Sequence, residues 1–203
     1  MERRYKLRID GLSGKIETVI NDPGPYRCGL ALIAHPHPLH GGSLDNKVVK
    51  TLADTLVELG YVAVRPNFRG VGQSEGCYDH GRGEVDDMLS TANFVTSKYP
   101  DLPLILAGFS FGAYVQCQAS QLLSPRNVIL VAPAVNLFEF CSPRSGAIII
   151  HGERDELVPT ASVNIWAQAN GQKVTMIPGA DHFFHRKLAE LKRVIKHELH
   201  PPA

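Results

Sequence analysis

The sequence lacks the features that define several large classes of protein. No apolar run approaches the length that spans a bilayer, and the start, MERRYKLRID, is charged and has no apolar core of a signal peptide. The 21 Lys and Arg residues balance 20 Asp and Glu residues, without a long run of one sign. We therefore expect a cytoplasmic protein that has neither nucleic acid nor a membrane as a partner.

Closely spaced cysteines are also absent. Cys28, Cys77, Cys117 and Cys141 form no C-x-x-C motif, which disfavours a zinc cage or a dithiol redox site, and we expect reduced, mostly packed thiols. A chain of 203 residues, 44% of them hydrophobic, buries enough surface on folding to need neither disulfides nor a metal. No repeat or linker divides it, so a single domain over residues 1–203 is predicted.

The sequence does contain a succession of short apolar runs, at residues 30–34, 62–64, 104–108, 128–132, 147–150 and 174–177. They do not alternate with polar residues, which is typical of strands covered on both faces. Helix-like stretches separate them, such as the apolar stripe that ends at Gly60. This order predicts an α/β fold, with a doubly wound, mostly parallel sheet, helices on both faces, and an antiparallel hairpin at one edge formed by residues 3–20.

A serine between two glycines, GFSFG at residues 108–112, stands where a predicted strand ends and a helix begins. This placement of G-x-S-x-G is typical of a nucleophile elbow, in which Ser110 occupies a strained turn and the glycines let strand and helix approach closely. The alternative is that Ser110 merely caps the helix, a common role for serine. A base elsewhere in the chain would favour the catalytic interpretation.

An acid and a histidine follow the last two apolar runs, in HGERDELVP and PGADHFFH. Because the carboxyl ends of parallel strands meet at one edge of a sheet, Ser110, Asp155 and His182 are predicted to form a catalytic triad. His182 would transfer the proton and Asp155 would orient its ring. Glu153 and Glu156 share the acid's loop, but the short side chain of Asp155 suits a fixed position better.

The predicted oxyanion donors are the backbone N–H groups of Phe111 and His37. Phe111 begins the helix after the serine, where the helix dipole favours negative charge. In the loop HPHPLHGGS the prolines at positions 36 and 38 have no N–H, so His37 is the donor available between them.

The same loop allows a metal site as an alternative, because His35, His37 and His40 are close in sequence. The prolines impose an extended backbone, however, so the imidazoles need not converge, and no acidic residue follows until Asp45. We therefore predict no metal and no cofactor. His35 is expected to anchor the loop through hydrogen bonds.

The segments HPHPLHGGSLDNKVV, NFRGVGQSEG, GFSFG, HGERDELVP and GADHFFH together resemble the α/β-hydrolase superfamily, over about residues 28–199. Within it they look like small lidless serine hydrolases similar to dienelactone hydrolases and bacterial carboxylesterases. The resemblance implies the triad and the oxyanion donors named above, and a loop wall shaped by Arg69 and Gly70. Dienelactone hydrolases carry cysteine, and dehalogenases and epoxide hydrolases aspartate, where this chain has Ser110, which disfavours those activities.

Residues 133–146 are too few for the lid that many superfamily members carry, so we expect an open site with Leu137, Phe138 and Phe140 as an apolar wall, or alternatively as the core of a short helix. The sequence thus predicts a serine hydrolase that cleaves small-molecule carboxylic esters of small acyl groups through an acyl-enzyme, with thioesters left open. The alternatives are a peptidase or carbon–carbon bond hydrolase on the same triad, and a non-catalytic small-molecule-binding protein. Nothing in the sequence indicates an oligomeric state.

Overall fold

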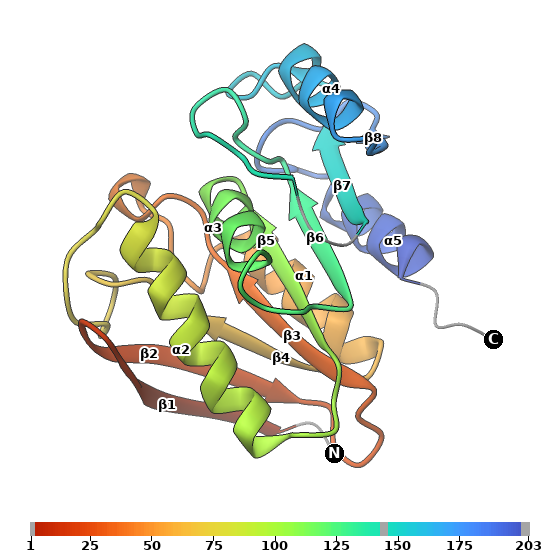
Figure 1. Cartoon of the computed structure of the whole chain (residues 1–203). Coiled ribbons are helices and arrows are strands. Elements are labelled where there is room, and N and C mark those ends of the chain that lie inside the picture. The colour runs from red at the N-terminus through yellow and green to blue at the C-terminus, as the bar shows by residue number, and fades with distance from the viewer. Residues whose placement is uncertain (1–2, 143–145, 200–203) are drawn as a thin grey trace.

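The computed structural model describes residues 3–142 and 146–199, whose strands form one eight-stranded sheet (Figure 1). The order across the sheet is β1-β2-β4-β3-β5-β6-β7-β8. The strands from β3 to β8 are parallel, whereas β1 and β2 form an antiparallel hairpin that joins the sheet through β4. The strands are β1 (Arg3–Gly11), β2 (Gly14–Asp22), β3 (Gly29–Ala34), β4 (Tyr61–Pro66), β5 (Leu104–Phe109), β6 (Asn127–Val131), β7 (Ala147–Gly152) and β8 (Val174–Ile177).

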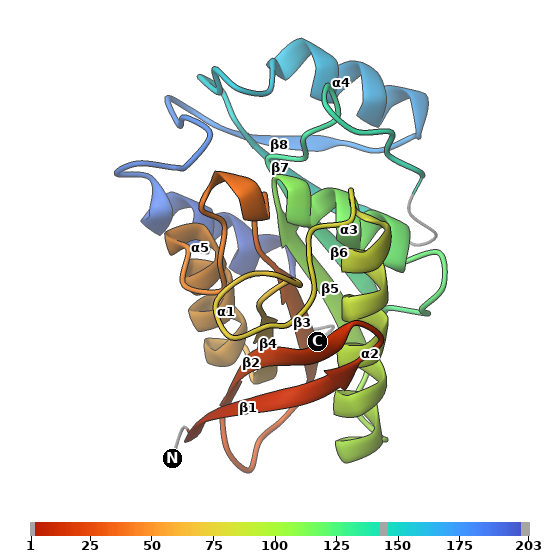
Figure 2. The ribbon, with the colours of Figure 1, turned by 90° about the vertical axis from the view of Figure 1, so that its left-hand side faces the viewer.

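Helices cover both faces of the sheet, as Figure 2 shows most clearly. One layer consists of α2, α3 and α4, and the other of α1 and α5, each packed on its own hydrophobic cluster. The helices are α1 (Lys47–Glu58), α2 (Arg82–Lys98), α3 (Phe111–Ala119), α4 (Thr160–Ala169), α5 (Leu188–Glu198) and the short 3₁₀ helix η1 (Pro38–His40). None of the helices in the described ranges is long and apolar enough to cross a bilayer.

The central strands explain why the apolar runs do not alternate. All six residues of β3 are buried, with Leu30 and Leu32 in one cluster and Ala31 and Ile33 in the other. Because successive side chains of a strand point to opposite faces, a strand covered on both faces must be apolar throughout. The predicted doubly wound sheet and its edge hairpin are confirmed.

The chain between β6 and β7 is short and irregular. Residues 132–142 and 146 contain no helix or strand, and residues 143–145 lie outside the described residues. No cap domain is inserted here in the described part of the chain, which agrees with the sequence prediction. The loops after β5, β7 and β8 therefore meet at an uncovered end of the sheet.

Candidate active site

Ser110 occupies a strained turn between β5 and α3. Its φ of 56° and ψ of −116° lie in a region that residues other than glycine rarely adopt. A Cβ atom at Gly108 would clash with the carbonyl of Gly112, and one at Gly112 would clash with the carbonyl of Ala34. The two glycines are therefore required because the strand, the helix and β3 approach too closely for side chains.

A continuous chain of hydrogen bonds runs from Ser110 through His182 to Asp155. His182 Nε2 lies 3.0 Å from Ser110 Oγ, and His182 Nδ1 lies 2.7 Å from Asp155 Oδ2. An ionised carboxylate can only accept, so Nδ1 carries the ring proton and Nε2 is left to accept from the serine hydroxyl. The neutral imidazole is thus held in the tautomer that can take a proton from Ser110.

Asp155 is fixed by the backbone of its own loop. Its Oδ1 accepts from the N–H groups of Leu157 and Val158, at 2.9 and 2.8 Å. Burial disfavours the charged carboxylate, but the hydrogen bond and charge of His182, with the Val158 N–H, outweigh burial and lower the pKa of Asp155. The carboxylate is therefore ionised at neutral pH and points at His182.

The other acids near the predicted triad have different partners. Glu153 accepts from the N–H of Gly179 at 2.8 Å, and Asp181 accepts from the backbone N–H and Nδ1 of His185 at 2.9 and 2.7 Å. Glu156 is exposed. Among the described carboxylates, Asp155 is the one that hydrogen-bonds the ring of His182.

The loops that carry the acid and the histidine approach closely at Gly152, the last residue of β7. A Cβ atom on Gly152 would lie 2.5 Å from the carbonyl oxygen of Ala180. The N–H of Arg154 donates to the same carbonyl at 2.8 Å. This backbone contact brings His182 within reach of Asp155 and leaves no room for a side chain at the crossing.

The backbone N–H groups of His37 and Phe111, beside Ser110, have no acceptor within the described part of the chain. Phe111 is the first residue of α3, where the helix dipole favours negative charge. His37 follows β3, immediately before η1. Both residues line the same cavity as Ser110, so their free N–H groups are available to a negatively charged oxygen there.

The ring of His37 is held by its neighbours. Nδ1 accepts from the N–H of Leu39 at 3.2 Å, so the ring proton is on Nε2, which lies 3.2 Å from Tyr78 Oη. Burial, helped by the nearby His40 and His80, lowers the pKa of His37. A neutral, hydrogen-bonded ring therefore fixes the backbone at this position.

His35 is fully buried and anchors the HPHPLHGGS loop through hydrogen bonds of its ring. Its Nδ1 lies 2.7 Å from the carbonyl oxygen of Pro36, and its Nε2 accepts from the N–H of Phe68 at 3.0 Å. Both ring nitrogens are thus engaged, so His35 has no lone pair to offer a metal together with His37 and His40. No group of three or more His, Cys, Asp or Glu side chains in the described ranges is arranged to hold a metal ion.

Acidification is expected to destabilise the fold through His35. Burial lowers its pKa in the folded chain to about 4, from 6.5, so between these values the unfolded chain binds more protons. The contribution of His35 to the free energy of unfolding should be complete above pH 6.5. The free energy of unfolding should fall by about 3 kcal/mol as the pH drops to about 4. Urea unfolding at a series of pH values measures the slope of the free energy of unfolding against pH.

His35→Gln supplies the comparison, because glutamine keeps an acceptor for Phe68 and does not titrate. The variant should lose most of the slope. His151, which is also buried with a lowered pKa, leaves a residual slope of the same sign. An acid slope of the same size in the variant and the wild type would show that His35 is not its source.

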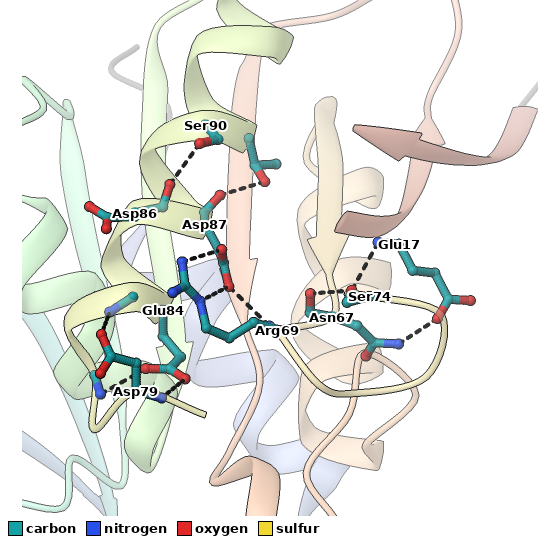
Figure 3. A network of polar contacts seen from close by, with 12 residues as sticks. Glu17, Asn67, Arg69, Ser74, Asp79, Glu84, Asp86, Asp87 and Ser90 are labelled. Atoms are coloured by element: carbon teal, nitrogen blue, oxygen red, sulfur yellow. Dashed lines mark hydrogen bonds and ion pairs between the residues drawn. The ribbon is translucent and has the colours of Figure 1, made fainter. Parts of the chain in front are cut away.

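A buried polar network anchors the loop over residues 67–81, which carries Tyr78 (Figure 3). Arg69 Nε and Nη2 donate to the two oxygens of Asp87 on α2, at 3.1 and 2.8 Å, and the backbone N–H of Arg69 adds a third bond at 2.9 Å. Glu84 accepts from two backbone N–H groups of the same loop. Arg69 therefore holds the loop in place, whereas neither Arg69 nor Gly70 lines the cavity, so the wall expected from these two residues is not part of it.

A cavity of about 690 Å³ opens beside Ser110 and His182. Leu137, Leu157 and Phe183 line it and are 65%, 54% and 42% exposed, so its mouth is open to solvent. Its apolar side is formed by Ala134, Leu137, Phe138, Leu157, Val158 and Phe183. An open, largely apolar cavity suits a small apolar group bound next to the serine.

The predicted apolar wall is only partly right. Leu137 and Phe138 line the cavity, but Phe140 packs between Tyr114 of α3 and Trp166 of α4, with ring centroids 5.5 and 5.3 Å away. Phe138 and Phe140 are two residues apart but contact different parts of the protein, because the irregular chain turns between them.

Sequence reasoning missed His151 and Tyr78. His151 is fully buried at the end of β7, where its Nε2 lies 3.0 Å from the carbonyl oxygen of Val158 and 3.6 Å from Asp155 Oδ2. It therefore supports the loop of the acid. The signal that could have found His151 is its position at a strand end just before that loop. Tyr78 carries no such signal, because it reaches His37 through the fold of a long loop.

Comparisons with known proteins agree with this fold. A family model described as serine aminopeptidase, S33, matches residues 37–144, more than half of the chain. XC6422 from Xanthomonas campestris, an α/β serine hydrolase without a lid, is 38% identical, with a TM-score of 0.91 over 96% of this chain and 93% of that one. An α/β serine hydrolase homologue from Coxiella burnetii is also 38% identical, with a TM-score of 0.92 over 96% and 97%. The uncharacterized protein RP471 of Rickettsia prowazekii (strain Madrid E) is 33% identical, over 94% of this chain and 86% of the relative.

The fold, the uncovered sheet end and these similarities define the class of protein as an α/β serine hydrolase without a cap domain. Within that class, the chain belongs to the serine aminopeptidase S33 family. Membership establishes the fold and the hydrolytic class. The substrate has to be argued from the site, because one fold serves many specificities.

Proposed function

We propose that the protein cleaves carboxylic esters of small acyl groups, and chemically similar thioesters, through an acyl-enzyme formed on Ser110. The observation that carries the proposal is the hydrogen-bonded chain Ser110–His182–Asp155, with distances of 3.0 and 2.7 Å. As Ser110 Oγ attacks the substrate carbonyl carbon, His182 Nε2 takes the hydroxyl proton. Asp155 holds the ring in the required tautomer and stabilises its charged form.

The attack converts the carbonyl oxygen into an oxyanion. The N–H groups of His37 and Phe111 have no other acceptor and would donate to it. His182 then gives its proton to the leaving alcohol, and the acyl group remains on Ser110. Water, deprotonated by the same His182, attacks the acyl-enzyme and releases the carboxylic acid, which returns Ser110 to its starting state.

The cavity favours an ester over the N-terminal peptide bond that the family description suggests. An aminopeptidase substrate carries an α-ammonium group, whose positive charge needs a carboxylate partner when it is taken out of water. None of the described residues that line the cavity is Asp or Glu, and Asp155 already accepts from His182 and two backbone N–H groups. The apolar side of the cavity suits an acyl chain instead.

The conformation of Ser110 also disfavours a protein that only binds a small molecule. A residue held in a sparsely populated backbone region costs of order 1–3 kcal/mol. A receptor gains nothing from that strain, whereas a nucleophile needs it to present its hydroxyl above the sheet. The strained φ and ψ of Ser110 therefore support catalysis.

Ester hydrolysis is expected to depend on acyl length in a graded way. Each methylene that the cavity buries gains about 0.8 kcal/mol, or about fourfold in kcat/KM, so rates should rise with acyl length and level off where an open cavity leaves further methylenes in water. Kinetics with p-nitrophenyl esters from acetate to palmitate measure the series. Short soluble esters should react without activation by an interface.

Amino-acid anilides and a β-diketone serve as comparison substrates for peptidase and carbon–carbon bond hydrolase activity. Both should react far more slowly than the best ester. Faster cleavage of an anilide, or a preference for emulsified long-chain lipid, would reject the proposed specificity.

A further inference from the structure

Cys117 and Cys141 lie side by side although they are 24 positions apart. Their Sγ atoms are 3.3 Å apart, Cys117 Sγ lies 2.9 Å from the carbonyl oxygen of Cys141, and Cys141 Sγ lies 3.2 Å from the carbonyl oxygen of Cys117. Cys117 is buried in α3 and Cys141 is partly exposed. The sequence disfavoured a dithiol site because no C-x-x-C motif is present, but the fold brings these two thiols together.

We propose that Cys117 and Cys141 are a reversible dithiol–disulfide site, whose oxidation ties the wall of the cavity beside Ser110 to α3. A disulfide bond is about 2.0 Å long, so the two sulfurs have to approach by about 1.3 Å. That shift is small for an irregular segment that contacts the helix through side chains. The effect on catalysis rests on the proposed esterase function, whereas formation of the disulfide does not.

The wall segment, residues 136–142, connects the cavity with Cys141. Leu137 and Phe138 of this segment line the cavity. Its last residues are held by α3 and the turn that follows it: Gln118 in the helix donates to the carbonyl of Glu139 at 3.1 Å, and Gln121, just beyond the helix end, donates to the carbonyl of Ser142 at 2.7 Å. The helix itself begins directly after Ser110. A covalent bond from α3 to Cys141 would therefore restrain the segment that shapes the acyl side of the cavity.

The two thiols have different chemical roles. The hydrogen bond from Cys117 lowers the pKa of Cys141, and the same contact raises the pKa of Cys117. Cys141 is also the more exposed sulfur. Because the thiolate is the nucleophile, Cys141 reacts first with an oxidant and Cys117 resolves the product.

With hydrogen peroxide as the oxidant, the Cys141 thiolate attacks one peroxide oxygen and the O–O bond breaks. Cys141 becomes a sulfenic acid, and the departing hydroxide takes up the proton lost from Cys141 to give water. The sulfur of Cys117 then attacks the sulfur of Cys141, so that the S–S bond forms and the S–O bond breaks. The Cys117 proton leaves with the hydroxide as a second water, and the two thiols have lost two electrons to one peroxide.

Peptide mapping without reduction tests the site directly. Wild type, Cys141→Ser, Cys117→Ala and a matched control, Cys77→Ser at an exposed free cysteine, are treated with hydrogen peroxide and digested. Wild type and Cys77→Ser should give a peptide that links Cys117 to Cys141, an intact mass lower by two hydrogen atoms, and recovery of both thiols with dithiothreitol. Neither Cys141→Ser nor Cys117→Ala should give the linked peptide.

Two further readouts separate this inference from the proposed function. The disulfide should raise the Tm of the wild type by several degrees, since it restricts the unfolded chain. Oxidation should also slow the longest accepted esters several-fold and leave acetate esters little changed, reversibly and only when both thiols are present. A linked peptide and a raised Tm in a protein without esterase activity would support the dithiol site and reject the function.

The inference fails under two results. If peroxide modifies the exposed Cys28 and Cys77 but no peptide links Cys117 to Cys141, the dithiol site is wrong. If the link forms and the acyl-length profile of an active enzyme stays the same, the restraint on the wall segment is wrong.

Discussion

Ser110→Ala is expected to lower ester turnover by about 10⁵- to 10⁶-fold while the fold is retained. Without the hydroxyl no acyl-enzyme can form, and the remaining acceleration would come from substrate binding and the N–H groups of His37 and Phe111. The Oγ atom contacts His182, so alanine removes one polar contact at an open site and creates no cavity in the core. Measurements of kcat/KM and Tm on the same preparations test both expectations.

The matched control is Ser97→Ala, at an exposed serine of α2 far from the cavity lining. It should keep wild-type turnover. A Ser110→Ala protein with an unchanged Tm and substantial activity would remove Ser110 from the mechanism.

Asp155→Asn is expected to lower kcat by about 10⁴-fold. Asparagine keeps an oxygen that can accept from the N–H groups of Leu157 and Val158, so the loop should hold its shape. Its amide group, however, donates a hydrogen bond to His182 Nδ1, which must then be the acceptor nitrogen, so the ring proton is on Nε2. A ring in that tautomer cannot accept the proton of Ser110, and the loss should appear in kcat more than in KM.

Two acids of the same loop provide controls for this variant. Glu153→Gln and Glu156→Gln remove the same charge without contact to His182, and each should reduce turnover only slightly. If Glu156→Gln proved as damaging as Asp155→Asn, the assignment of the acid would have to change.

The strands could be predicted because burial on both faces leaves a direct trace in the sequence. Each apolar run from LALIA to VTMI coincides with one strand from β3 to β8. Once the strands are parallel, their carboxyl ends lie at one edge, and the residues that follow β5, β7 and β8 must meet there. That Ser110, Asp155 and His182 lie at one edge follows from topology, whereas their hydrogen-bond distances depend on loop conformation, such as the close approach of Gly152 to Ala180.

Other contacts could not be predicted, because they depend on loop conformations and on polar burial. The helix α2 shows no clear apolar stripe, since Glu84 and Asp87 are buried on its inner side in the network that holds Arg69. Tyr78 meets His37 through a long loop that this network fixes. Periodicity carries no information on either contact.

The cysteines show the same limit. Cys28 and Cys77 are exposed although packed thiols were expected, and Cys117 and Cys141 are in contact although their spacing gives no sign of it. Because the four cysteines follow no periodic pattern, the sequence predicts neither which of them are buried nor which of them are neighbours.

The most direct test of the central claim, that Ser110 is an activated nucleophile, is to locate the bond formed with a fluorophosphonate. Such reagents modify serines whose hydroxyl is activated by a base. We predict one equivalent of label per chain, on Ser110, with none on Ser110→Ala and strongly slowed labelling of Asp155→Asn. Label on a different serine, or no label on a preparation that hydrolyses esters, would contradict the account.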